Sequence, residues 1–93
     1  MNRDEAIQKA IEIITGDREQ EYGEPENSFE TIAEFWETYL TAREGTPISD
    51  WDVAVMMALL KIARIANGKF KEDSYVDAIG YLAIGAELAS EEV

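Results

Sequence analysis

Residues 53–66 read Val-Ala-Val-Met-Met-Ala-Leu-Leu-Lys-Ile-Ala-Arg-Ile-Ala, and this apolar stretch is the strongest indication of the fold. Its charged residues are Lys61 and Arg64, so a helix formed here is apolar almost all round. A helix with no face for water belongs at the centre of a helical bundle or at a subunit interface. Ser49 and Asp52, three residues apart, form a capping pair that predicts the start of this helix, which continues to the end of the stretch.

A second predicted helix, over residues 74–89, is nearly as apolar. Between its first residue and position 86, its polar groups are Asp77 and the hydroxyls of two tyrosines, Tyr75 and Tyr81. We therefore expect Asp77 to be buried. Gly80 and Gly85 each lower helix propensity by roughly 1 kcal/mol relative to alanine, a cost that is tolerated where a neighbouring helix approaches closely. The two glycines predict close packing of this helix on the preceding one.

Two amphipathic helices precede this apolar pair. The first is predicted over residues 3–15, with Asn2 as its N-cap and its isoleucines on one face. The second is predicted over residues 28–43, where Asn27 and Glu30 form a capping box. No sustained alternation of apolar and polar residues predicts a strand. The predicted fold class is therefore all-α, a four-helix bundle.

Length and charge limit the expected partners. The 93 residues form one domain, residues 1–93, and a chain of this size buries only about 60% of its unfolded surface. We therefore expect a homodimer or tetramer, with the two apolar helices at or near the interface. The net charge of −12 repels phosphate backbones and anionic membranes, so we expect no direct nucleic-acid or membrane binding.

The expected location is the cytosol. The chain has no cysteine, and its N-terminus lacks the basic and then apolar pattern of a secretory signal. No apolar run approaches the roughly 20 residues that a membrane-spanning helix needs.

The chain contains no histidine and no cysteine, so its candidate chemistry depends on carboxylates and cations. Asp73 and Asp77, four residues apart, share a helix face and repel each other unless a cation lies between them. Either a magnesium ion or the pair Lys61 and Arg64 would supply that cation. In a structural interpretation, Asp73 caps its helix and Asp77 pairs with Arg64, while Asp52 completes a capping box. In a functional interpretation, the three aspartates bind a metal ion and the two cations face the phosphates of a nucleotide.

Two further features lie outside the apolar helices. Residues 17–26 are rich in glycine, proline and charge, which predicts an exposed loop. Tyr22 in this loop either stacks on a nucleotide base or packs against the bundle. Glu30, Glu34 and Glu37 share one face of the second helix, and we expect that face to be solvated.

One combination of motifs carries a family resemblance. Residues 59–64, Leu-Leu-Lys-Ile-Ala-Arg, are followed at residues 73–81 by the pattern Asp-Ser-x-x-Asp-x-x-Gly-Tyr. Together with Tyr22-Gly23, this combination resembles a phage and prophage family of small helical domains of unknown function. That family is in turn similar to the MazG-type all-α nucleoside triphosphate pyrophosphohydrolases. The resemblance implies an all-α NTP pyrophosphatase-like bundle that dimerises and handles nucleotides with magnesium.

The match to the MazG-type signature is partial. That signature is a Glu-Glu-x-x-Glu helix followed by a Glu-x-x-Asp helix. Asp77 falls at the aspartate of the second motif, Ser74 occupies the place of its glutamate, and the first motif has no counterpart in the helix from Ser49.

Two functions therefore stay open. One is a protein that binds or cleaves nucleoside triphosphates with magnesium. The other is a non-enzymatic, acidic phage protein in the host cytosol. Its acidic run over residues 17–37 would mimic nucleic acid or bind a host protein.

Overall fold

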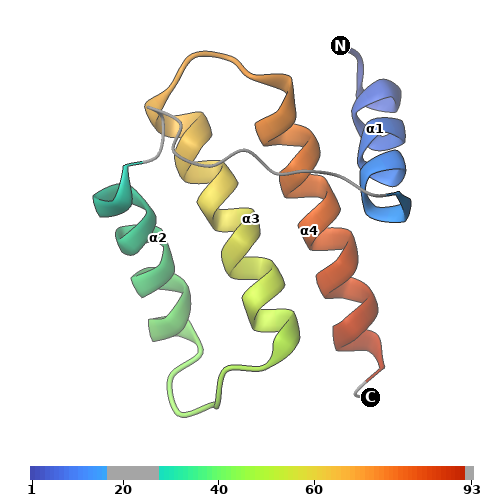
Figure 1. Cartoon of the computed structure of the whole chain (residues 1–93). Coiled ribbons are helices and arrows are strands. Elements are labelled where there is room, and N and C mark those ends of the chain that lie inside the picture. The colour runs from blue at the N-terminus through green and yellow to red at the C-terminus, as the bar shows by residue number, and fades with distance from the viewer. Residues whose placement is uncertain (17–27, 92–93) are drawn as a thin grey trace.

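The computed structural model describes residues 1–16 and 28–91, and all regular structure in this part of the chain is helical. The helices, shown in Figure 1, are α1 (Arg3–Thr15), α2 (Phe29–Ala42), α3 (Asp50–Asn67) and α4 (Glu72–Ser90). The predicted all-α class is confirmed for these residues. The predicted loop over residues 17–26, with Tyr22, and the predicted cap Asn27 lie outside the described residues.

Two helices begin where the sequence predicts. Asn2 Oδ1 accepts a hydrogen bond from the backbone N–H of Glu5 at 2.8 Å, and α1 follows directly. At the start of α3, Ser49 and Asp52 form a reciprocal capping box through their side chains and backbone amides. These bonds satisfy amides that have no partner within the first helical turn. Both predicted N-caps are confirmed.

The other two helices begin at different residues from those predicted. α2 starts one residue later, and its N-cap is Ser28 rather than Asn27, because the Ser28 hydroxyl accepts from the backbone N–H of Thr31 at 3.2 Å. α4 starts two residues earlier, with Lys71 as an N-cap that makes no side-chain capping bond. Asp73 is therefore not the cap of α4. It lies in the first turn, where a negative charge interacts favourably with the helix dipole.

The helices lie side by side in the order α2, α3, α4, α1 (Figure 1). Contacts join α2 to α3, α3 to α4 and α4 to α1, and within the described ranges α1 and α2 do not contact each other. A closed four-helix bundle would need that last contact to complete its ring. The helices therefore form an open layer rather than the predicted bundle, because α1 packs on the side of α4 that faces away from α3.

Small residues set the spacing between the helices. A Cβ atom added at Gly85 would lie 3.3 Å from the Cβ of Ala54, which confirms the predicted close approach of α4 to α3 at this glycine. Gly80 serves a different contact, because a Cβ there would lie 3.0 Å from Cγ2 of Ile14 on α1. Five of the seven buried apolar residues in the described ranges are alanines, and the full set is Ala10, Ile32, Ala54, Ala58, Ala63, Val76 and Ala78. The core is thin as a result.

Large apolar side chains stay exposed on each helix. On the two central helices they include Val53, which is 50% exposed, and Leu82, which is 48% exposed. A helical layer has two broad faces, and apolar side chains that no second layer covers remain in contact with water. Among the helices of the described ranges, none is long and apolar enough to cross a membrane.

Candidate functional site

A buried ion pair joins α3 to α4. Nζ of Lys61 lies 3.2 Å from Oδ2 of Asp77, and the two side chains are only 7% and 5% exposed. The predicted burial of Asp77 is thereby confirmed. The structural interpretation paired Asp77 with Arg64, but the ion pair observed here is with Lys61. Lys61 shares a stripe of α3 with Ala54, which approaches Gly85 of α4, whereas Arg64 lies on the neighbouring line of the helix surface.

Asp52 is held at the start of α3 by a set of hydrogen bonds. Its carboxylate accepts from the Tyr39 hydroxyl at 2.6 Å, from Nε of Arg43 at 3.1 Å, and from the backbone N–H and hydroxyl of Ser49 at 2.9 and 2.8 Å. Burial opposes ionisation, but these hydrogen bonds outweigh it and hold the pKa of Asp52 well below its usual range. Burial, together with the bond to Asp52, raises the pKa of Tyr39 to about 12. Asp52 of α3 thus links the end of α2 to the start of α3 through its bonds to Tyr39 and Arg43.

The three aspartates predicted as metal ligands, Asp52, Asp73 and Asp77, do not lie together at one site in the described part of the chain. Asp52 is hydrogen-bonded at the start of α3, whereas Asp77 pairs with Lys61, nine residues later on α3. At about 1.5 Å per residue, these two positions are about 13 Å apart along the axis of α3. Asp73 is exposed in the first turn of α4. No group of three or more acidic side chains in the described ranges is placed to hold a metal ion. These residues do not fit a magnesium centre of the kind that the resemblance implies.

Arg64 is a second buried cation on α3, nearly one turn after Lys61. It is 9% exposed, and its Nε atom is buried without a hydrogen-bond acceptor among residues 1–16 and 28–91. A guanidinium carries five N–H donors, and a buried donor without an acceptor costs about 1–3 kcal/mol. Since Asp52 pairs with Arg43, the other buried charges of α3 and α4 in this part of the chain are two cations, Lys61 and Arg64, and one carboxylate, Asp77. We call Lys61, Arg64 and Asp77 the charge cluster; together they carry one net positive charge, and the described residues supply no acceptor for Nε of Arg64.

The remaining candidates lie away from the charge cluster. Tyr22 is outside the described residues, so its predicted role stays a prediction. Glu30, Glu34 and Glu37 are all exposed on α2, as expected for a solvated helix face.

Sequence reasoning missed the role of Arg43. Its guanidinium lies over the ring of Trp51, 4.4 Å from the ring centre, and its Nε donates to Asp52. The sequence signal for this contact is Gly45-Thr46-Pro47, which ends the helix and leaves only a short connection before Ser49; in the structure Gly45 adopts a positive φ of 85° there. A short connection places two helices antiparallel, so the end of α2 must lie beside the start of α3.

These observations define a class of protein, a small all-helical domain whose two central helices bury charged side chains between them. The chain belongs to the DUF6378 family, a domain of unknown function, whose model matches residues 5–89. It is 45% identical over 75 residues to the Gene 55 protein of Mycobacterium phage L5, covering 81% of this chain and 46% of that protein. It is 36% identical over 87 residues to the Gene 55 protein of Mycobacterium phage D29, covering 94% of this chain and 55% of that protein.

The chain spans about half the length of the curated relatives it matches. No solved structure matches it at a significant level. The phage part of the predicted resemblance is confirmed by these relatives. Similarity to the MazG-type pyrophosphohydrolases is not shown by any of these comparisons.

Proposed function

We propose that this chain binds the phosphate groups of a nucleotide at the charge cluster, with Lys61 and Arg64 facing the phosphates. The observation that carries the proposal is the buried Nε of Arg64, which has no acceptor in the described part of the chain. Phosphate oxygens are well matched to a guanidinium, because its planar fork donates two parallel hydrogen bonds. Lys61 adds a point charge that Asp77 holds in position.

Magnesium enters this proposal as the ion that accompanies a nucleoside triphosphate. Asp73 precedes Asp77 of the charge cluster by about one turn of α4, so its carboxylate is on the same helix face as that of Asp77. Cleavage of the triphosphate would need more carboxylates than the described residues bring together. The proposed function is therefore binding, and hydrolysis is not part of it.

The first test is a thermal-shift screen of the whole chain. The ligands are a nucleoside triphosphate, the corresponding diphosphate and inorganic phosphate, each with magnesium and with a chelator. We expect the triphosphate with magnesium to raise the melting temperature, because binding to the native state stabilises it by mass action. We expect a smaller rise after chelation. If no nucleotide raises the melting temperature at millimolar concentration, the result would favour the alternative function, a non-enzymatic acidic protein that binds another protein.

The second test separates a binding role of Arg64 from a structural one. Arg64→Met keeps an apolar stem and removes the donors, while Arg3→Met changes the same charge at an exposed position on α1. We expect Arg64→Met to weaken nucleotide binding about tenfold or more by calorimetry. Its melting temperature without ligand should stay equal or rise, since an uncompensated buried cation is lost. A lower melting temperature with unchanged nucleotide affinity would assign Arg64 to the fold instead.

A further inference from the structure

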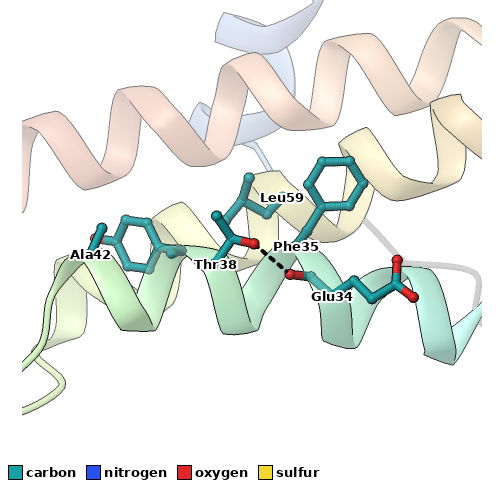
Figure 2. Close-up of a pocket in the computed structure, with 6 residues that line it drawn as sticks. Glu34, Phe35, Thr38, Ala42 and Leu59 are labelled. Carbon is teal, nitrogen blue, oxygen red and sulfur yellow. Dashed lines mark hydrogen bonds between the residues drawn. The ribbon is translucent and has the colours of Figure 1, made fainter.

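We infer that a groove along α2 binds a positively charged amphipathic helix of a partner protein. The groove has a volume of about 500 Å³. We call it the Phe35 groove, and Figure 2 shows its lining residues: Glu34, Phe35, Thr38, Tyr39 and Ala42 of α2 and Leu59 of α3. The α2 residues span just over two turns, so the groove follows the helix axis for about 12 Å. That length suits two turns of another helix.

The wall of the groove is apolar because its hydroxyl groups are engaged within the chain. Thr38 Oγ1 donates to the backbone oxygen of Glu34 at 3.0 Å, the dashed line in Figure 2. The Tyr39 hydroxyl donates to Asp52 at 2.6 Å. Phe35 and Leu59 are half-buried, so part of each side chain is available to a ligand. The lining thus offers mainly apolar contact, and only Glu34 carries a charge.

The rim of the groove is acidic. Glu34 lies at the rim, and Glu30 is one turn before it on the same exposed face of α2. α2 contains no basic residue that would neutralise these carboxylates. The net charge of −12 adds to the negative potential at this surface. A complementary ligand therefore combines apolar anchors with basic flanks.

An amphipathic helix with lysine or arginine beside its apolar stripe supplies that combination. Its apolar side chains, spaced at i, i+3 or i+4 and i+7, enter a groove of this kind while the basic side chains reach the rim. A second copy of this chain is poorly suited, because none of its four helices carries more basic than acidic residues. A small apolar ligand would leave the rim carboxylates unpaired. Charge complementarity thus selects a basic partner helix.

The binding test uses a labelled synthetic peptide of about four helical turns, built from leucine and lysine in an amphipathic pattern. A second peptide carries glutamate at every lysine position. Fluorescence anisotropy should show binding of the lysine peptide that weakens as salt screens the charges, and no binding of the glutamate peptide. Chemical-shift changes in the nuclear magnetic resonance spectrum of the chain should cluster on Phe35, Ala42 and Leu59.

Matched variants locate the binding surface. Glu34→Lys and Glu37→Lys make the same charge change on α2, but Glu37 lines a different groove, together with Ala33, Trp36, Leu40, Thr41 and Glu44. We expect Glu34→Lys to weaken binding of the lysine peptide about fivefold or more, and Glu37→Lys to have a clearly smaller effect on that binding. Ala42→Arg, at an exposed position of the groove, should also weaken binding without loss of folding.

Three outcomes would overturn the inference. Equal losses in Glu34→Lys and Glu37→Lys would show only general attraction to an acidic chain. Tight binding of the glutamate peptide would remove the charge argument. Shift changes confined to another surface, such as that around Leu82, would place the peptide elsewhere. Because no groove residue belongs to the charge cluster of Lys61, Arg64 and Asp77, none of these outcomes depends on nucleotide binding.

Discussion

The Lys61–Asp77 ion pair lies where α3 and α4 meet, and its two charges depend on each other. Asp77→Ala would leave the ammonium group of Lys61 buried without this carboxylate. Breaking a buried pair by removing one partner costs roughly 3–5 kcal/mol, so we expect Asp77→Ala to melt far below wild type. Thermal and urea unfolding of the Asp77→Ala variant and the wild-type protein measure this difference in stability.

Two further variants serve as controls for the Asp77→Ala prediction. Asp73→Ala removes a carboxylate from the same helix at an exposed position, and we expect a much smaller loss of stability. The double change Lys61→Met with Asp77→Leu should recover most of the loss, because apolar residues often replace a buried ion pair at little cost. If Asp77→Ala melts together with wild type, the ion pair contributes nothing to the fold.

At the scale of the elements, Gly85 sets how closely α4 packs on α3. In an ordinary helix, Gly85→Ala would gain roughly 1 kcal/mol of helix propensity. Here the added methyl group would lie 3.3 Å from the Cβ of Ala54, which is fixed to the backbone and cannot rotate away. We therefore expect a net loss of about 1–2 kcal/mol from overpacking, measured by urea unfolding.

A second change tests whether this contact is the cause. Ala54→Gly removes the opposing methyl group, so in the Gly85→Ala background it should cost less than it does in wild type. Gly80→Ala provides a comparison, because its new methyl group meets Cγ2 of Ile14, a side-chain atom that can move by rotation about χ1, as the Cβ of Ala54 cannot. A stabilised Gly85→Ala chain would show that the two helices separate easily at this point.

At the scale of the whole molecule, the open layer favours self-association. Val53 and Leu82 are about half exposed on the two central helices, and a second layer would cover such residues. We expect light scattering at micromolar concentration to show a mass above that of the monomer. Because each copy carries a charge of −12, salt should screen the repulsion and strengthen the association.

Charged substitutions identify the associating surface. We expect Val53→Glu and Leu82→Glu to lower the measured mass, since each places a carboxylate in the apolar surface of the central helices. Ile48→Glu is the matched control, because Ile48 is 59% exposed in the connection between α2 and α3. A sharp monomer mass that does not depend on concentration or salt would contradict association.

The helical elements could be predicted from sequence patterns, because the signals for a helix are local. Apolar periodicity of about one turn predicted all four helices, and Asn2 and the Ser49–Asp52 pair located two helix starts. The apolar surroundings of Asp77 in the sequence were enough to predict its burial. Where two polar residues compete near a helix start, as Asn27 and Ser28 do, local rules are correct only to within a residue or two.

Which side chains meet depends on how the helices pack against one another, and sequence patterns did not predict it. The carboxylate of Asp77 faces Lys61 rather than Arg64, and that of Asp52 receives Tyr39 and Arg43 from α2. Such pairings depend on the rotation and register of one helix against another, which many small contacts along the whole interface set together. The same apolar stripes are also compatible with a closed bundle and with an open layer, so the sequence pattern alone does not distinguish the two. The physical difference is that a cap is complete within one helical turn, whereas an ion pair between helices depends on the packing of both.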